Sequence, residues 1–427
     1  MIMKNKYFFG FLFILVLLSV IIWQRNLTSR NIISKEERGY YLSNGTGIYA
    51  MIENDTLDNI TINLEISQGN ARKIKEQYED YDFINENLEM YAAIQNIVGI
   101  AEVYIGEYRQ AYARLKDTID FIEDKELVHK DNILVVLYNN VGAMNLYYSH
   151  TKERDEYLEK AYELCQEPYM SLVIQANQSM RIGEHATRKQ QGIMLREMEK
   201  LIKAAKKMEG NDGLVQYVVE RYLEGGYMTV SQEERAIKKL NEYIIQIPDL
   251  PEYNMIKTEM LGQLGYGYNL TGEYDKAIQV LEQSITTAQK TVDENSQELA
   301  REYGRLAKSY GKKGEWEIAR EYLKKMIPGC KEMLLREQGM LYFNIGHCSW
   351  EMEDYEESKR NYFKSYICYC LYDQEIDPEG TNFEYSYPIH DYLEKFYKAE
   401  EVEISYAAWM EKEMMEIGLE PDQWLVN

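Results

Sequence analysis

The sequence predicts an all-α chain of stacked helical hairpins that follows one membrane-spanning helix. Three observations carry this prediction: a phrase that recurs along the chain, a helix-forming composition with only seven prolines in 427 residues, and one long apolar run near the N-terminus. We expect every proline to mark a helix boundary, because proline lacks the N–H that a helix interior needs. A recurring phrase marks one supersecondary unit that cannot bury its own apolar face, so several units must stack.

The apolar run covers residues 7–23 (YFFGFLFILVLLSVIIW) and contains no charged residue. At about 1.5 Å per residue it spans about 25 Å, the short end of the range for a transmembrane helix. We expect residues 1–24 to form an uncleaved signal anchor. A cleaved signal peptide is the alternative, which the length of the run and the lack of an Ala-x-Ala-like site disfavour. Lys4 and Lys6 favour a cytoplasmic N-terminus and an extracytoplasmic array. Arg25 and the five cysteines without evident partners favour the opposite orientation, with the array in the cytoplasm.

The rest of the chain divides by composition. Residues 25–50 are polar, contain Gly and Asn, and are expected to form a juxtamembrane linker. Residues 51–85 show helical spacing of apolar residues, and over 60–66 also the alternation of a strand. We favour a helical lead-in, because a lone strand would have no partner. Residues 86–419 are expected to form the repeat array and residues 420–427 a C-terminal tail.

The recurring phrase is clearest at residues 264–281 (LGYGYNLTGEYDKAIQVL) and returns at 98–115, at 306–323 and, more loosely, at 345–362. It places a small residue where two helices cross, a Gly-x-Tyr turn, and then Ala and Leu four residues apart on the second helix. The spacing of these phrases predicts about eight hairpins. The small residues expected at the crossings are Gly99, Gly142, Ala176, Gly265, Ala307 and Gly346.

These phrases resemble the tetratricopeptide repeat, whose pattern combines Leu-Gly, a following Tyr, and Ala on the second helix. Leu264 and Gly265 take the Leu-Gly place, Tyr268 the Tyr place and Ala277 the Ala place. The chain departs from the family in its repeat spacing of about 39–43 residues instead of about 34, and in Glu102, which replaces the Tyr of the first repeat. The resemblance implies a right-handed α-solenoid whose first helices line a concave surface, and a protein- or peptide-binding role.

The matched repeats allow the side chains of that concave surface to be predicted. Asn amides can donate to and accept from a peptide backbone, and aromatic rings supply apolar pockets. The candidate peptide-groove residues are Asn96, Tyr104, Asn139, Tyr147, Tyr266, Asn269, His347 and Trp350. The alternative for each of them is packing between helices or simple exposure to water.

The net charge of −23, from 48 basic and 71 acidic residues, argues against a nucleic-acid partner, which would need a basic stripe. It favours either an acidic solvated face or a basic protein partner.

Nothing in the sequence predicts a cofactor, a metal site or catalysis. His347–Cys348 and the pair Cys368 and Cys370 are expected on opposite helices of one hairpin, on the order of 12 Å apart along it, too far to share one zinc ion. The five cysteines follow no disulfide framework. The sequence also lacks the nucleophile-elbow, zinc-protease and phosphate-loop motifs.

We therefore expect a membrane-tethered adaptor or scaffold that binds proteins or peptides. The alternative is a ligand-sensing component of a signal-transduction system that works through a partner kinase or regulator. A structural member of an envelope complex is a third candidate.

Overall fold

The computed structural model describes residues 59–80, 87–148, 151–179, 187–210, 213–331, 333–376 and 386–416. All regular structure in these segments is helical, which confirms the predicted fold class for them. The predicted anchor over residues 7–23, the linker over 25–50 and the tail over 420–427 lie outside the described residues. Within the described part of the chain, no helix combines the length and the apolar character needed to cross a membrane.

The lead-in consists of α3 (Asn59–Glu65) and α4 (Ala71–Tyr78), joined by the π-helical turn η1 (Ile66–Asn70). The stretch whose pattern also fitted a strand is therefore helical. Its apolar side chains Ile62, Ile66 and Ile74 are buried against the first repeat, so tertiary packing supports these short helices.

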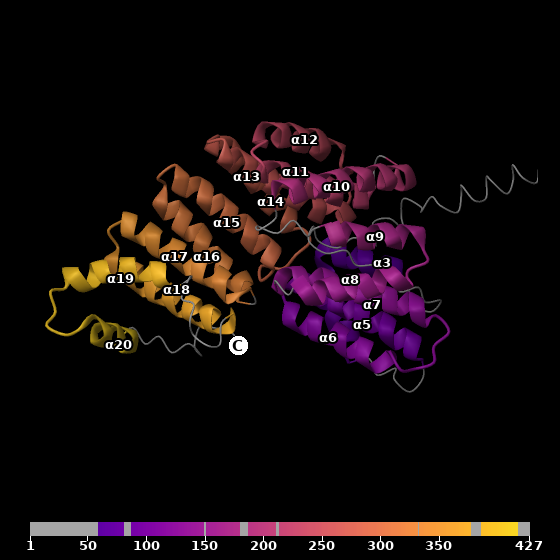
Figure 1. The fold of residues 1–427 in the computed structure, drawn as a ribbon, viewed down its shortest axis with the longest axis horizontal. Coiled ribbons are helices and arrows are strands. Elements are labelled where there is room, and N and C mark those ends of the chain that lie inside the picture. Colours follow the sequence, from indigo (N-terminus) through magenta and orange to yellow (C-terminus); the bar gives the residue numbers. More distant parts are fainter. Residues whose placement is uncertain are drawn as a thin grey trace, which may run out of the picture.

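Eight consecutive helix pairs follow among the described residues, the number that the sequence predicts (Figure 1). The pairs are α5 (Leu88–Ile105) with α6 (Tyr108–Ile122), α7 (Lys130–Tyr148) with α8 (Thr151–Leu164), α9 (Pro168–Ser179) with α10 (Arg188–Glu209), α11 (Leu214–Thr229) with α12 (Glu233–Gln246), α13 (Asn254–Leu270) with α14 (Tyr274–Ala288), α15 (Gln297–Lys312) with α16 (Trp316–Cys330), α17 (Leu335–Glu351) with α18 (Tyr355–Ile376), and α19 (Tyr387–Ala399) with α20 (Tyr406–Glu416). A short 3-10 turn, η2 (Pro251–Tyr253), precedes α13.

The small residues predicted at the helix crossings hold the hairpins together. Each predicted crossing glycine receives the side chain that lies sixteen residues further along the chain, as Gly265 receives Leu281. The predicted crossing at Ala176 departs from this rule, because the residue sixteen positions later is Gly192, which has no side chain. A Cβ atom on Gly265 would lie 2.5 Å from Cγ of Leu281, and one on Gly142 would lie 2.7 Å from Cγ of Leu158. Since packed side chains do not approach so closely, any larger residue would force the two helices apart.

Where the turn is among the described residues, a residue with positive φ stands seven positions after the crossing residue. Gly272 and Gly314 occupy this place with φ of 78°, which glycine adopts at little cost. Ser231 takes the same place in the α11–α12 hairpin with φ of 61°. Counting back seven residues identifies Glu224 as the crossing residue of that hairpin, where the other repeats have Gly or Ala.

One expectation about proline is wrong. Pro328 lies inside α16, two residues before its last residue Cys330, and not at a helix boundary. Because Pro328 falls in the last turn of α16, its missing N–H removes a single hydrogen bond near the frayed end of the helix.

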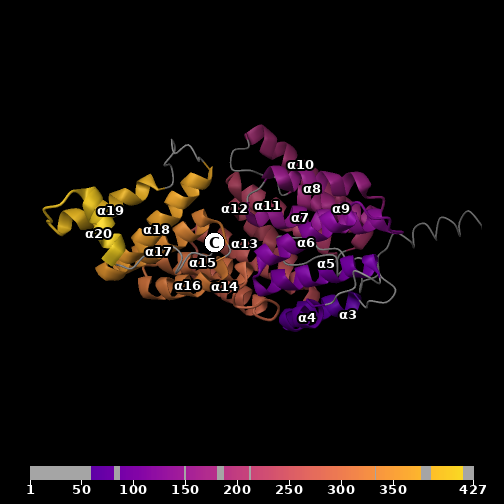
Figure 2. The same ribbon diagram turned by 90° about the horizontal axis from the view of Figure 1, so that it is seen from below.

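The first repeats curve until the lead-in meets the connection between α14 and α15. The backbone N–H of Asp293 donates to the carbonyl of Tyr104 over 3.1 Å. Arg72 forms an ion pair of 2.9 Å with the carboxylate of Asp293, and the hydroxyl of Tyr108 donates to the buried carboxylate of Glu298. We call residues 59–298, which these contacts close on themselves, the closed region; Figure 2 shows α3 and α4 at one edge of it.

The C-terminal arm, α16–α20, extends from the closed region (Figure 1). Helix α15 joins the two parts, because Leu299 and Leu306 belong to the core of the closed region while Ala300 and Ala307 belong to the next core. The arm ends in a third, aromatic core around Phe363 and Trp409.

Candidate functional site

The predicted groove residues of the first two repeats lie inside the closed region. Asn96 is 1% exposed and Asn139 is 0% exposed. The amide of Asn140 donates to Asn96 over 2.7 Å, that of Asn139 to Asn140 over 3.1 Å, and that of Asn177 to Asn139 over 2.9 Å. These four amides therefore form a ladder across α5, α7 and α9, which we call the amide ladder.

Sequence analysis missed two members of the amide ladder, Asn140 and Asn177. Asn140 follows a predicted residue directly, and Asn177 comes 38 residues after Asn139, close to the repeat spacing. This separation was the feature of the sequence that could have identified Asn177. Of the other predicted residues in these repeats, Tyr104 is buried beside the closing contact, and the side chain of Tyr147 lies outside the described residues.

Tyr266 and Asn269 come together on α13 with a side chain of the next repeat. The ammonium of Lys308 on α15 lies 5.3 Å from the centre of the Tyr266 ring, and Tyr266 is partly exposed. Asn269 is only 8% exposed, yet neither its amide nitrogen nor its amide oxygen has a hydrogen-bond partner. A buried amide without partners costs about 1–3 kcal/mol, and Asn269 is the one predicted groove residue among those described whose amide is left in this state at both atoms.

His347 and Trp350 lie on α17 in the arm, where they belong to a partly exposed aromatic face. His347 contacts Trp316 edge-on at 5.6 Å between ring centres, and Trp350 contacts Phe396 at 5.3 Å. The ammonium of Lys395 lies 5.8 Å from the centre of the Trp350 ring. The predicted groove residues thus fall into three separate places: the amide ladder, the α13–α15 contact and the arm.

Helix α11 carries a row of buried polar residues that sequence analysis did not predict, because the recurring phrase does not cover this helix. Gln216, Glu220 and Glu224 lie one turn apart, all are buried, and each has an acceptor oxygen without a partner. Arg235 of α12 donates to the other oxygen of Glu224 over 2.9 Å. Burial raises the pKa of both carboxyl groups from 4.5 to about 7, partly opposed by the Gln216 amide at Glu220 and by Arg235 at Glu224.

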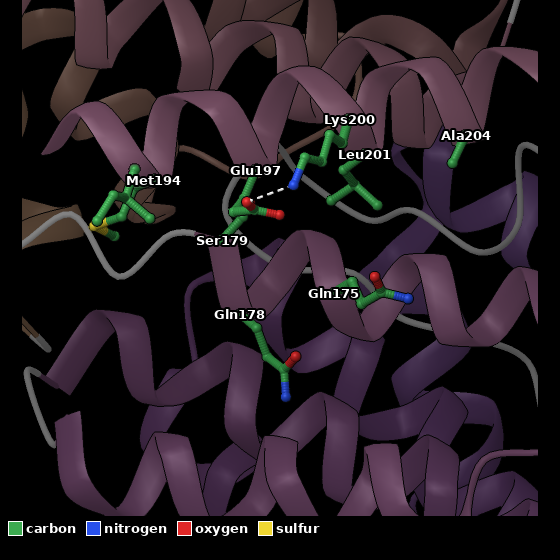
Figure 3. A pocket seen from close by; sticks show the side chains of 9 residues that line it. Gln175, Gln178, Ser179, Met194, Glu197, Lys200, Leu201 and Ala204 are labelled. Atoms are coloured by element: carbon green, nitrogen blue, oxygen red, sulfur yellow. Dashed lines mark hydrogen bonds and ion pairs between the residues drawn. The ribbon is translucent and has the colours of Figure 1, made fainter. Parts of the chain in front are cut away.

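A cleft of about 490 Å³ separates α9 from α10 (Figure 3). Gln175, Gln178 and Ser179 line it from α9, and the lining residues of α10 are Ile193, Met194, Glu197, Lys200, Leu201 and Ala204. The segment between these two helices, residues 180–187, is longer than the two or three residues that separate the helices of the hairpins with matched phrases.

The thiol groups are unsuited to chemistry. Burial raises the pKa of Cys348 to about 11 and that of Cys368 to about 12, so both stay protonated near neutral pH. The described residues contain no group of three or more His, Cys, Asp or Glu side chains that could hold a metal ion.

Comparison with known proteins agrees with the hairpin geometry. Residues 258–332 and residues 341–365 match models of the tetratricopeptide repeat. These two segments are therefore tetratricopeptide repeats, which typically form scaffolds for protein–protein interaction rather than catalytic sites. No curated protein matches the sequence.

Several solved structures match most of the length of this chain. The Cut9–Hcn1 hetero-tetramer of the APC/C has a TM-score of 0.48 and 13% identity over 79% of this chain, which spans 55% of that chain. A Rap protein in complex with the Competence and Sporulation Factor has a TM-score of 0.44 and 11% identity, covering 77% of this chain and 98% of its own. A signal-transduction ATPase with a tetratricopeptide-repeat sensor from Pyrococcus horikoshii has a TM-score of 0.41 and 16% identity, covering 76% and 50%.

Proposed function

We propose that the protein is a membrane-tethered scaffold that binds an extended peptide segment of a partner protein along α13. The observation that carries this proposal is Asn269, whose amide is buried and has no partner at either atom. One Asn side chain can donate to a backbone carbonyl and accept from a backbone N–H. Tyr266 lies one turn before Asn269 on α13 and supplies an apolar ring, and the exposed Lys308 near that ring supplies a positive charge.

Replacement of Asn269 by Leu tests this role. We expect the variant to be as stable as the parent or more stable, because a pair of unsatisfied polar atoms is removed. The full-length variant should capture the partner from detergent-solubilised membranes with an affinity lower on the order of tenfold. This decrease corresponds to the free energy of one or two hydrogen bonds. Undiminished capture by a folded Asn269→Leu protein would rule the proposal out.

Asn139→Leu is the matched control, because it makes the same chemical change inside the amide ladder. We expect it to lower the free energy of unfolding by about 1–3 kcal/mol, since Asn140 and Asn177 each lose a partner. Chemical denaturation of both variants measures the contrast. A similar loss of stability in Asn269→Leu would show that its amide is structural.

The tether is the predicted span over residues 7–23, with the repeat array on the extracytoplasmic side. We expect the full chain to fractionate with membranes and a chain without residues 1–24 to be soluble and helical, because the described repeats bury apolar cores of their own. Fractionation and circular dichroism check both statements. An insoluble or unfolded truncated chain would show that the boundary is misplaced.

A further inference from the structure

Helix α10 differs in charge from the rest of the chain. It contains seven basic and three acidic residues within 22, while the whole chain carries a net charge of −23. Helical periodicity of 100° per residue puts five of the basic residues within a sector of about 60°. These five, which we call the basic stripe, are Lys189, Arg196, Lys200, Lys203 and Lys207.

The basic stripe is exposed along its whole length. Lys200 forms an ion pair of 2.8 Å with Glu197. Within the described part of the chain, the other four members of the stripe have no carboxylate within ion-pair distance, although acidic residues outnumber basic ones overall. Four positive charges are therefore left for a group outside the described fold.

The basic stripe borders the cleft between α9 and α10. On the surface of α10 the cleft residues Ile193, Leu201 and Ala204 occupy the sector next to the stripe, and Ile193 is 43% exposed. The opposite wall, from α9, is lined by the uncharged residues Gln175 and Gln178, and the Gln178 amide donates to the carbonyl of Leu158 on α8 (Figure 3). The cleft also holds the carboxylate of Glu197, whose charge the ion pair with Lys200 offsets. A mainly apolar floor, an uncharged wall and a basic rim thus run side by side.

We propose that this cleft binds an acidic amphipathic helix of a partner protein. The apolar side of such a helix would contact Ile193 and Leu201, and its carboxylates would meet the basic stripe. An anionic bilayer fits less well, because the apolar residues are recessed between two helices. The local charge selects an acidic partner here, in contrast to the basic partner that net charge alone favours. This surface is separate from Asn269 and does not depend on the function proposed for α13.

Two synthetic probes test the proposal on the full chain in detergent micelles. The first is a helical peptide of about 18 residues with Leu along one stripe and Glu beside it, long enough to form a helix. The second keeps the Leu positions and has Lys in place of Glu. Fluorescence anisotropy should show binding of the acidic peptide at least about tenfold tighter than binding of the basic one, and a marked loss of affinity with added salt.

Two pairs of charge reversals locate the site. Arg196→Glu with Lys207→Glu reverses two members of the basic stripe and should weaken binding of the acidic peptide on the order of tenfold or more. Lys206→Glu with Lys152→Glu changes the net charge equally, at exposed positions outside the stripe, and should leave binding within about twofold of the parent.

The apolar floor has its own matched pair. Ile193→Ser should weaken binding of the acidic peptide about tenfold, whereas Ile245→Ser, at a position on α12 that is 84% exposed, should not. Equal loss in both charge-reversal variants, or equal binding of both peptides, would overturn the proposal. The proposal would also be overturned if phosphatidylserine, added to vesicles that carry the full chain, slowed the hydrogen exchange of α10 while the acidic peptide did not.

Discussion

In the closed region the inner side chains of successive repeats contact one another, whereas in the C-terminal arm the corresponding side chains face solvent in part. Asn96 and Asn139 stand three residues before their crossing glycines and are buried in the amide ladder. Phe343, three residues before Gly346, is only partly buried, and Met340 on the same helix is 53% exposed. The hairpins are alike, so the difference comes from how far the array curves. The position within a repeat decides which side chain faces inward. The long-range closing contacts decide whether that inner face is covered or exposed to solvent.

The strongest test of this comparison is a pair of glycine substitutions at equivalent turns. Gly106 has φ of 91°, and a Cβ atom there would lie 2.2 Å from the carbonyl oxygen of Asn295 in the closing contact. We expect Gly106→Ala to lower the free energy of unfolding by about 4 kcal/mol, from backbone strain and from the clash together. Chemical denaturation followed by circular dichroism measures the loss.

Gly314→Ala is the control, at the turn that opens the arm. Its φ is 78°, but a Cβ atom would meet nothing within 4 Å. We expect a loss of about 1 kcal/mol from backbone strain alone. Equal losses at the two turns would mean that the closing contact contributes little and that the closed region is an ordinary open array.

A smaller effect is expected from the carboxyl groups of α11, which lie in the closed region. Since the pKa of Glu220 is 4.5 unfolded and about 7 folded, the folded state binds more protons between these values. The stabilisation by the protonated form is complete below pH 4.5 and is lost as the pH rises to about 7. We expect Glu220→Gln to be more stable than the parent by about 2–3 kcal/mol at pH 8 and nearly equal at pH 4.5.

Thermal or chemical unfolding across pH 4–8 measures this difference. Glu351→Gln removes an exposed carboxylate of α17 in the arm and should change stability by less than about 0.5 kcal/mol at every pH. If the difference in stability between the Glu220→Gln variant and the parent stayed constant from pH 4 to 8, the buried carboxyl group would not titrate between pH 4.5 and 7.

The smallest expected effect concerns metal ions. His347, Cys348 and Cys368 all lie in the arm, so a metal there would stabilise that part alone. We expect EDTA to leave the melting temperature of the full chain unchanged within about 1 °C, since no ion would be removed from the fold. A decrease of several degrees would place a metal-dependent element in the arm.

The sequence was sufficient for the hairpins, because their geometry depends on local contacts such as Gly265 with Leu281. It was insufficient for the closed region, since the contact of Tyr104 with Asp293 depends on the curvature summed over several repeats. The candidate sites divide in the same way. Tyr266 and Asn269 lie in a clear repeat and could be named as candidates from the sequence, whereas Glu220 and Glu224 lie in a repeat whose crossing residue departs from the phrase. The cleft beside α10 lies in a hairpin that no recurring phrase covers, so the sequence pattern gave no sign of it.

The closing contact also has a consequence for the order of events during synthesis. Tyr108 leaves the ribosome 190 residues before its partner Glu298. At about 5–20 residues per second, the first repeat waits roughly 10–40 s with the surface that will meet residues 289–296 still uncovered. An open chain of repeats can mature one hairpin at a time, but here the first hairpin is completed only after the fifth has been made.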